Sequence, residues 1–208
     1  MKKIAEDIVI EGKKKKSFID FFIRKLEKIL SEHLIFAKLY TAFFYKMTID
    51  EFKMIDLPEN SKVVNIGCGS LPHTLIILAK QRKWNMVGID HDKVAIKKAV
   101  EMIKHYDLSD KIKIMYGEGI SVDYSQFNLI IISHGVEPKK QVLEKLGKEI
   151  DKKSMILYRT IWDGLNRVYG KEPVPSNLKI INTYDRIDGI KAFLLMKNIH
   201  QGKTINKH

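Results

Sequence analysis

The stretch from Ser61 to Asp90 constrains the fold of this 208-residue chain most strongly, and reads SKVVNIGCGSLPHTLIILAKQRKWNMVGID. Its first apolar run stops at Gly67-Cys68-Gly69 and a second apolar run follows, which is typical of a buried strand, a glycine turn and a helix. Another strand-like run ends in Asp90. In a βαβ unit, an acidic residue about 20 positions beyond the glycine turn lies beside it and accepts hydrogen bonds from a ribose. The stretch therefore predicts a nucleoside site.

The glycine spacing indicates which nucleoside is expected. A dinucleotide site uses G-x-G-x-x-G, whose third glycine lets the helix N-terminus approach a pyrophosphate. Here Gly67 and Gly69 are followed by Pro72, which suits the first turn of a helix but does not replace the third glycine. The pattern favours S-adenosylmethionine, which has a ribose and an adenine but no phosphate, over a nicotinamide cofactor. A tight turn in an α/β domain without a ligand is the remaining alternative.

Composition excludes several classes of protein. Cys68 is the single cysteine, so we expect no disulfide framework and no metal site. No stretch approaches the roughly 20 apolar residues of a membrane span, and the N-terminus lacks the apolar region of a secretory signal. We therefore expect a cytoplasmic protein without a membrane partner. The net charge of +12 comes from lysines spread along the chain, which favours a solvated surface over a nucleic-acid footprint.

The N-terminal quarter of the chain is expected to be helical. Apolar residues have helical spacing in 18–30, and 33–45 is rich in aromatic residues. Thr48 and Glu51 fit a capping box, which predicts that a further helix begins at Thr48. The expected organisation is a small helical cap over residues 1–57, a Rossmann-like domain over 58–199 and a frayed tail over 200–208.

Strand and helix signals alternate from residue 61 onward, so the fold class is α/β with a mostly parallel sheet. Two final strands joined by a turn at Asp188-Gly189 predict a closing antiparallel hairpin. The expected strands after Asp90 span 111–115, 127–133, 155–159, 178–183 and 190–196. The expected helices span 92–106, with Asp92 as N-cap, and 138–148.

Polar residues and glycines follow four successive predicted strands and should meet at one edge of the sheet. Over about residues 60–198 this arrangement resembles the class I S-adenosylmethionine-dependent methyltransferases, which implies a Rossmann-like, mostly parallel seven-stranded sheet. The resemblance implies that Asp90 holds the ribose hydroxyls, that Glu118 lies near the adenine and that the glycine loop meets the amino-acid half of the cofactor. The implied cofactor-binding residues are Gly67, Cys68, Gly69, Leu71, Asp90, His91, Glu118, Gly119 and Ser133.

Three short strings indicate a narrower resemblance. Residues 67–74 (GCGSLPHT), 137–139 (EPK) and 156–160 (ILYRT) together resemble the nicotianamine synthase family, with its archaeal members closest. That family transfers the 3-amino-3-carboxypropyl arm of S-adenosylmethionine, which implies a small amine or amino acid as acceptor. Phe43 and Phe44 stand where the family has an Asn-Tyr pair. Methyl transfer to a small molecule, or with less support to RNA, and a non-catalytic cofactor-binding protein are the alternatives.

The candidate catalytic residues are Glu51, His134 and Tyr158. The resemblance makes Glu51 the counterpart of a functional glutamate, although the capping box explains it equally simply. His134 follows a predicted strand and is suited to act as a base near neutral pH, or is an ordinary loop histidine. Tyr158 and its neighbour Arg159 lie in an apolar strand. A buried arginine requires an anionic partner, for which a substrate carboxylate and Asp163 are the candidates.

Overall fold

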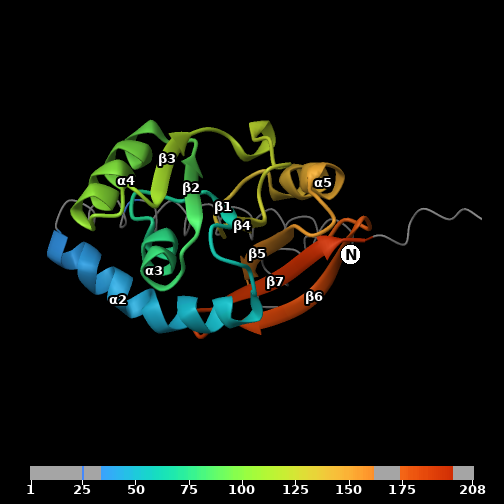
Figure 1. Ribbon diagram of the computed structural model, residues 1–208, viewed down its shortest axis with the longest axis horizontal. Coiled ribbons are helices and arrows are strands. Elements are labelled where there is room, and N and C mark those ends of the chain that lie inside the picture. Colours follow the sequence, from blue (N-terminus) through green and yellow to red (C-terminus); the bar gives the residue numbers. More distant parts are fainter. Residues whose placement is uncertain (1–24, 26–33, 162–173, 199–208) are drawn as a thin grey trace, which may run out of the picture.

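The computed structural model describes Lys25, residues 34–161 and residues 174–198 (Figure 1). In these parts of the chain, seven strands form one sheet in the order β3-β2-β1-β4-β5-β7-β6. The strands are β1 (Lys62–Ile66), β2 (Asn85–Asp90), β3 (Ile112–Tyr116), β4 (Leu129–Ile132), β5 (Met155–Ile161), β6 (Leu178–Asp185) and β7 (Ile190–Lys197). The first five are mutually parallel, and β7 is antiparallel to both β5 and β6. The mostly parallel sheet with a closing hairpin is therefore confirmed.

Alternating side chains of the central strands build two cores, one on each face of the sheet. In β1, Val63 belongs to the core under α3 (His73–Gln81) and α4 (Lys93–His105), whereas Val64 belongs to the core under α5 (Lys139–Glu149). Figure 1 shows α3 and α4 on one side of the sheet and α5 on the other. A parallel strand is buried on both faces in this way, which explains the continuous apolar run LIII of β4.

The N-terminal part of the described chain is one long helix, α2 (Leu34–Glu51), followed by the short 3-10 helix η1 (Phe52–Met54). The predicted capping box is wrong, because α2 runs through Thr48 and the Thr48 side chain is buried. Thr48 therefore lies inside α2 and does not begin a helix, although the sequence around it matches a helix start. Ala37 of α2 packs against Leu71, which holds α2 beside the start of α3. Apart from Lys25, the expected helix 18–30 lies outside the described residues, as does the tail 200–208. The division into cap and main domain stays a prediction.

Two local predictions, one about a helix cap and one about a turn, are confirmed. Asp92 caps α4, with its Oδ1 accepting from Val94 N at 2.8 Å. Gly189 has φ +85° in the β6–β7 turn. Glycine adopts this conformation readily, which is why the Asp-Gly pair predicted a turn here. These predictions succeeded because capping and turn chemistry act over only a few residues.

Candidate functional site

The loop between β1 and α3 requires glycine on geometric grounds. Gly67 and Gly69 have φ +70° and +71°, a region that residues with a side chain rarely occupy. The Gly67 N–H donates to Ile89 O at 2.8 Å, which holds the loop against the end of β2. A Cβ on Gly67 would lie 2.7 Å from Val136 Cγ2. The backbone of the loop at Gly67 therefore packs so closely against Val136 that no side chain fits there.

Asp90 fastens this loop to the end of β2. Its Oδ2 accepts from Gly69 N at 2.9 Å, and its Oδ1 accepts from Asp92 N at 3.0 Å. His91 Nδ1 lies 3.6 Å from Asp90 Oδ1. The side chain of Asp90 is 10% exposed, so the carboxylate keeps a small surface toward the cavity described next. One carboxylate therefore orders the glycine loop and remains accessible to a ligand.

A cavity of about 620 Å³ opens at the carboxyl ends of the parallel strands. Ligands of open α/β sheets bind at this edge of the sheet. Most of the residues predicted for cofactor binding, together with the catalytic candidate His134, line it. They are Gly67, Cys68, Gly69, Asp90, His91, Glu118, Gly119, Ser133 and His134. These residues, which follow successive strands in the sequence, therefore surround one cavity.

Three predicted site residues lie elsewhere. Leu71 is fully buried in a small cluster with Ala37. Tyr158 is 1% exposed in the core on the α5 side, where its ring stacks on Phe193 with centroids 6.2 Å apart. Glu51 is fully buried behind the cavity wall. Among the described residues that line the cavity, none of these three is present.

Glu51 is the centre of a buried ion-pair network. Arg159 of β5 donates from Nε to Glu51 Oε1 at 2.8 Å and from Nη2 to Oε2 at 2.6 Å. Arg186 of the β6–β7 turn donates from Nη1 to Glu51 Oε2 at 3.1 Å. Arg159 has an anionic partner, as expected for a buried arginine, but that partner is Glu51 and neither of the two predicted candidates; Asp163 lies outside the described residues. Bidentate pairs of this kind fix both side chains in position.

Arg186 also binds Asp188, and both line the cavity. Arg186 donates from Nη2 to Asp188 Oδ2 at 2.7 Å and from Nε to Oδ1 at 3.1 Å. Burial by itself would raise the pKa of Asp188, but the hydrogen bonds and positive charge of Arg186 lower it below its usual value. The hairpin thus contributes a fixed anion to the cavity and connects it to Glu51.

Three aromatic rings form another part of the cavity wall. Tyr40 and Phe44 lie one turn apart on α2, and their ring centroids are 4.7 Å apart. His73 at the start of α3 lies 4.8 Å from Phe44 and 5.4 Å from Tyr40, again between centroids. Burial, followed by the positive charges of Arg159 and Arg186, lowers the pKa of His73 to about 3. His73 is therefore neutral at pH 7.

Several cavity residues were not predicted from the sequence. Asn65 of β1 donates from its amide nitrogen to Ser133 Oγ at 2.8 Å, joining two strand ends. The only sequence signal for Asn65 was a polar residue inside an apolar strand. The sequence indicated Asp188 only as part of a turn and Phe44 only as part of an aromatic-rich segment, and Arg186 was not singled out. Their contacts bring together segments far apart in the chain, for which a single sequence offers no pattern.

The described residues include neither a metal-binding cluster nor a membrane-spanning helix. They contain no group of three or more histidine, cysteine, aspartate or glutamate side chains that could hold a metal ion. No helix among them is long and apolar enough to cross a membrane.

Comparison with known proteins places this fold and cavity in a family. A family model described as nicotianamine synthase protein matches residues 29–191, well over half of the chain. The chain belongs to the nicotianamine synthase family. No curated protein matches the sequence of this family member.

Solved structures confirm the fold of this nicotianamine synthase family member. A glutamate-to-glutamine variant of MtNAS in complex with S-adenosylmethionine has a TM-score of 0.74 at 16% identity, covering 89% of this chain and 76% of that one. MtNAS in complex with MTA and tNA gives 0.71 at 18%, covering 84% and 70%. An RNA methyltransferase from Salinibacter ruber in complex with S-adenosyl-L-homocysteine gives 0.60 at 15%, covering 78% and 97%. These likenesses confirm the predicted class I methyltransferase fold.

The three strings that resemble the nicotianamine synthase family meet at the cavity. The first contributes the glycine loop and His73, the second contributes Glu137 and Pro138, and the third contributes Arg159. In this family member the strings are separated in sequence by β2 to β4 and by α5, yet they surround one space. Strings that are far apart in the sequence therefore line the same cavity.

Proposed function

We propose that this chain is an S-adenosylmethionine-dependent transferase that moves the 3-amino-3-carboxypropyl arm to a small amine or amino acid. The observation that carries the proposal is the cavity at the strand ends, where the glycine loop and Asp90 meet in a member of the nicotianamine synthase family. MtNAS, a structural relative, has been solved with S-adenosylmethionine and with MTA, the abbreviation of methylthioadenosine. Methylthioadenosine is what remains of the cofactor after transfer of that arm.

The residues present fit this cofactor. Gly67 and Gly69 line the cavity with backbone and no side chain, as a close approach of the amino-acid half of the cofactor would require. Asp90 is placed to accept hydrogen bonds from ribose hydroxyls while continuing to hold Gly69. Glu118 follows β3 on the same edge and would lie near the adenine amino group. None of these roles needs a phosphate contact, in agreement with the missing third glycine.

The chemistry asks little of the protein beyond position. S-adenosylmethionine supplies a carbon made electrophilic by a sulfonium, and its leaving group departs as a neutral thioether. The chain must orient the acceptor amine and remove its proton. His134 lines the cavity and is the candidate base. Glu51 lies behind the cavity wall, where it holds the side chains of Arg159 and Arg186 in place, and acts as a positioning residue. Tyr158 supports β5 from the opposite core.

The identity of the by-product tests the transferred group. The protein is incubated with S-adenosylmethionine and a panel of amines and amino acids, and the nucleoside released is identified by mass spectrometry. We expect methylthioadenosine, which reports transfer of the aminocarboxypropyl arm. Release of S-adenosylhomocysteine would instead establish methyl transfer and overturn this assignment.

Asp90→Ala should weaken S-adenosylmethionine binding by at least about tenfold, because it removes charge-assisted hydrogen bonds both to the ligand and to the glycine loop. The measurement is calorimetric titration of the folded variant. Asp110→Ala is a control at an aspartate outside this cavity, and should leave the affinity unchanged. Equal affinities for the wild type and Asp90→Ala would exclude Asp90 from the cofactor site.

A further inference from the structure

Asn65 is a buried amide whose oxygen has no hydrogen-bond partner among the described residues. It lies near the carboxyl end of β1, is 2% exposed and lines the cavity. Its amide nitrogen donates to Ile66 O at 3.1 Å and to Ser133 Oγ at 2.8 Å, and lies 3.5 Å from Ile131 O. Because carbonyl oxygens only accept, these contacts fix the orientation of the amide and turn Oδ1 away from them. A buried amide oxygen of this kind is destabilising unless a donor reaches it from the cavity.

The hydroxyl of Ser133 lies beside this amide and still has its own proton to donate. Ser133 directly follows β4 and lines the cavity. Its Oγ accepts from Asn65 Nδ2, and no described residue accepts the hydroxyl hydrogen. A Cβ on Gly67 would lie 4.0 Å from Ser133 Oγ, so the hydroxyl adjoins the glycine loop. An open acceptor and an open donor therefore lie together at these strand ends.

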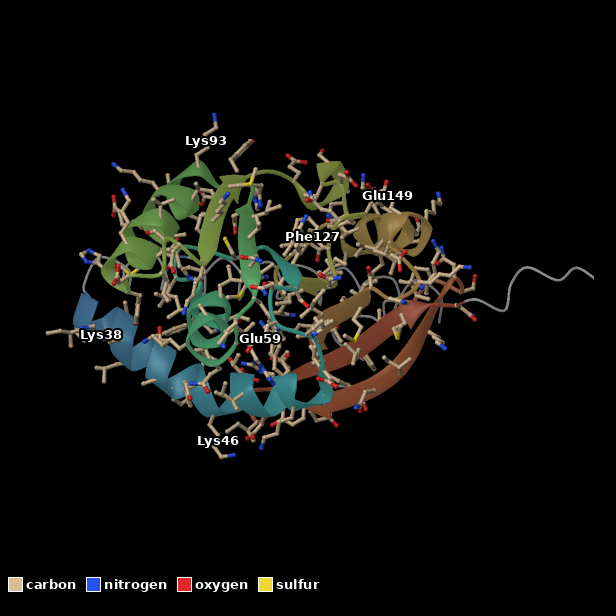
Figure 2. All side chains as sticks on the ribbon, in the orientation of Figure 1. Lys38, Lys46, Glu59, Lys93, Phe127 and Glu149 are labelled. Atoms are coloured by element: carbon tan, nitrogen blue, oxygen red, sulfur yellow. The ribbon has the colours of Figure 1, made fainter. Side chains whose placement is uncertain are left out.

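The cationic side chains of the cavity are already engaged. Arg159 and Arg186 belong to the buried ion-pair network. The described lining residues include no lysine, and lysines such as Lys46 and Lys93 point outward from their helices (Figure 2). A ligand carboxylate in this cavity therefore meets no unpaired lysine or arginine among these residues. Neutral donors such as the Ser133 hydroxyl become its partners.

These two open groups match the end of the cofactor arm. The arm ends in an α-amino acid, which carries on one carbon an ammonium that only donates and a carboxylate that only accepts. The ammonium complements Asn65 Oδ1, and the carboxylate complements the Ser133 hydroxyl. The glycine loop, which is expected to meet the amino-acid half of the cofactor, lies beside both groups.

We infer that Asn65 and Ser133 hold the amino and carboxylate groups of the arm that is transferred. This rests on the proposed function and names the residues that fix the arm. The ammonium donates to Asn65 Oδ1, and the Ser133 hydroxyl donates to the carboxylate. With the ribose held at Asp90, the sulfonium is then fixed from two sides. The arm carbon bonded to sulfur therefore keeps one direction toward the acceptor, which is what an in-line displacement requires.

S-adenosylmethionine and methylthioadenosine form a matched pair of ligands for the test, because methylthioadenosine keeps the adenine and ribose but lacks the arm. Each is titrated calorimetrically into the full-length protein and into Asn65→Leu, which preserves the size of the side chain but removes the amide. We expect the affinity for S-adenosylmethionine to fall at least about tenfold, and that for methylthioadenosine to change by less than about twofold.

Asn128→Leu is the matched control for this substitution. Asn128 precedes β4 at the opposite end of the strand, where its Oδ1 accepts from Lys62 N at 2.8 Å, and it does not line the cavity. Both affinities should equal those of the wild type. An unchanged S-adenosylmethionine affinity in Asn65→Leu, or an equal loss for both ligands, overturns the inference and leaves the proposed function standing. Failure of the wild type to bind S-adenosylmethionine overturns both.

Ser133→Ala keeps the test independent of the packing around β1, because it removes only a hydroxyl. The affinity for S-adenosylmethionine should fall by about threefold or more, with methylthioadenosine unaffected. Since Asn65 orients this hydroxyl, the double variant should lose little more than Asn65→Leu alone. Fully additive losses would contradict the joint action of the two residues.

Turnover separates the orientation of the arm from its affinity. Methylthioadenosine release is measured at saturating S-adenosylmethionine with the same panel of amines and amino acids. We expect a rate at least about tenfold lower in Asn65→Leu than in the wild type, because the arm carbon is no longer held in one direction. A wild-type rate in this variant contradicts the fixed arm. The absence of methylthioadenosine from the wild-type reaction contradicts the proposed function, while the binding comparison still decides whether the pair holds the arm.

Discussion

Glu51→Ala should lower the free energy of unfolding by about 3–5 kcal/mol, because it leaves two buried guanidinium groups without their shared anion. Glu51 is fully buried and accepts three hydrogen bonds from Arg159 and Arg186. The loss should be larger than that of an ordinary core truncation of similar size, since Arg159 loses its carboxylate partner and Arg186 keeps only Asp188. Chemical denaturation followed by circular dichroism measures the change.

The neighbouring residue supplies the control. Asp50 pairs with Lys46 at 2.5 Å and with Lys53 at 2.7 Å on the outer face of α2. Asp50→Ala should leave the stability close to that of the wild type, because exposed ion pairs contribute little. If Glu51→Ala destabilises the protein no more than Asp50→Ala, the network does not hold the hairpin against α2.

Gly67→Val should abolish measurable binding of S-adenosylmethionine. The valine must adopt φ +70° and place its Cβ 2.7 Å from Val136 Cγ2, so the loop has to shift out of the conformation that Asp90 holds through Gly69. The backbone strain alone costs about 1–3 kcal/mol of stability. Calorimetric titration measures the binding, and chemical denaturation of the same sample measures the stability.

Gly189→Val is a control that introduces backbone strain without the steric clash expected in Gly67→Val. Gly189 also has a positive φ, +85°, but a Cβ there meets nothing within 4 Å. This variant should lose stability through strain alone, and less of it than Gly67→Val. Binding of S-adenosylmethionine by Gly67→Val with wild-type affinity would show that the glycine loop is not the cofactor site.

The parallel sheet and the nucleotide-type loop could be predicted because their signals are local. The apolar runs, the glycines at 67 and 69 and the aspartate that ends β2 each report on the few residues around them. Capping by Asp92 and the turn at Gly189 were predicted for the same reason. Because carboxyl ends of parallel strands share one edge, local predictions also located the cavity.

The ion-pair network could not be predicted in the same way. Glu51 and Arg186 are 135 positions apart, and their contact depends on α2 crossing the end of the sheet beside the β6–β7 turn. The sequence at Thr48 matches a capping box, but α2 continues through Thr48, so the local pattern does not mark the start of a helix. Tyr158 was predicted as a site residue in the same apolar strand as Arg159, but successive residues of a strand face opposite sides, so the two side chains enter different layers.

Calorimetric titration of S-adenosylmethionine into the wild-type protein tests the central claim most directly. The cavity at the strand ends predicts one binding site per chain, from which methylthioadenosine displaces the ligand because both compounds carry the ribose and adenine expected at Asp90 and Glu118. Binding with this stoichiometry and competition is the predicted result. The absence of binding, or binding that methylthioadenosine does not compete with, would contradict the assignment of the site.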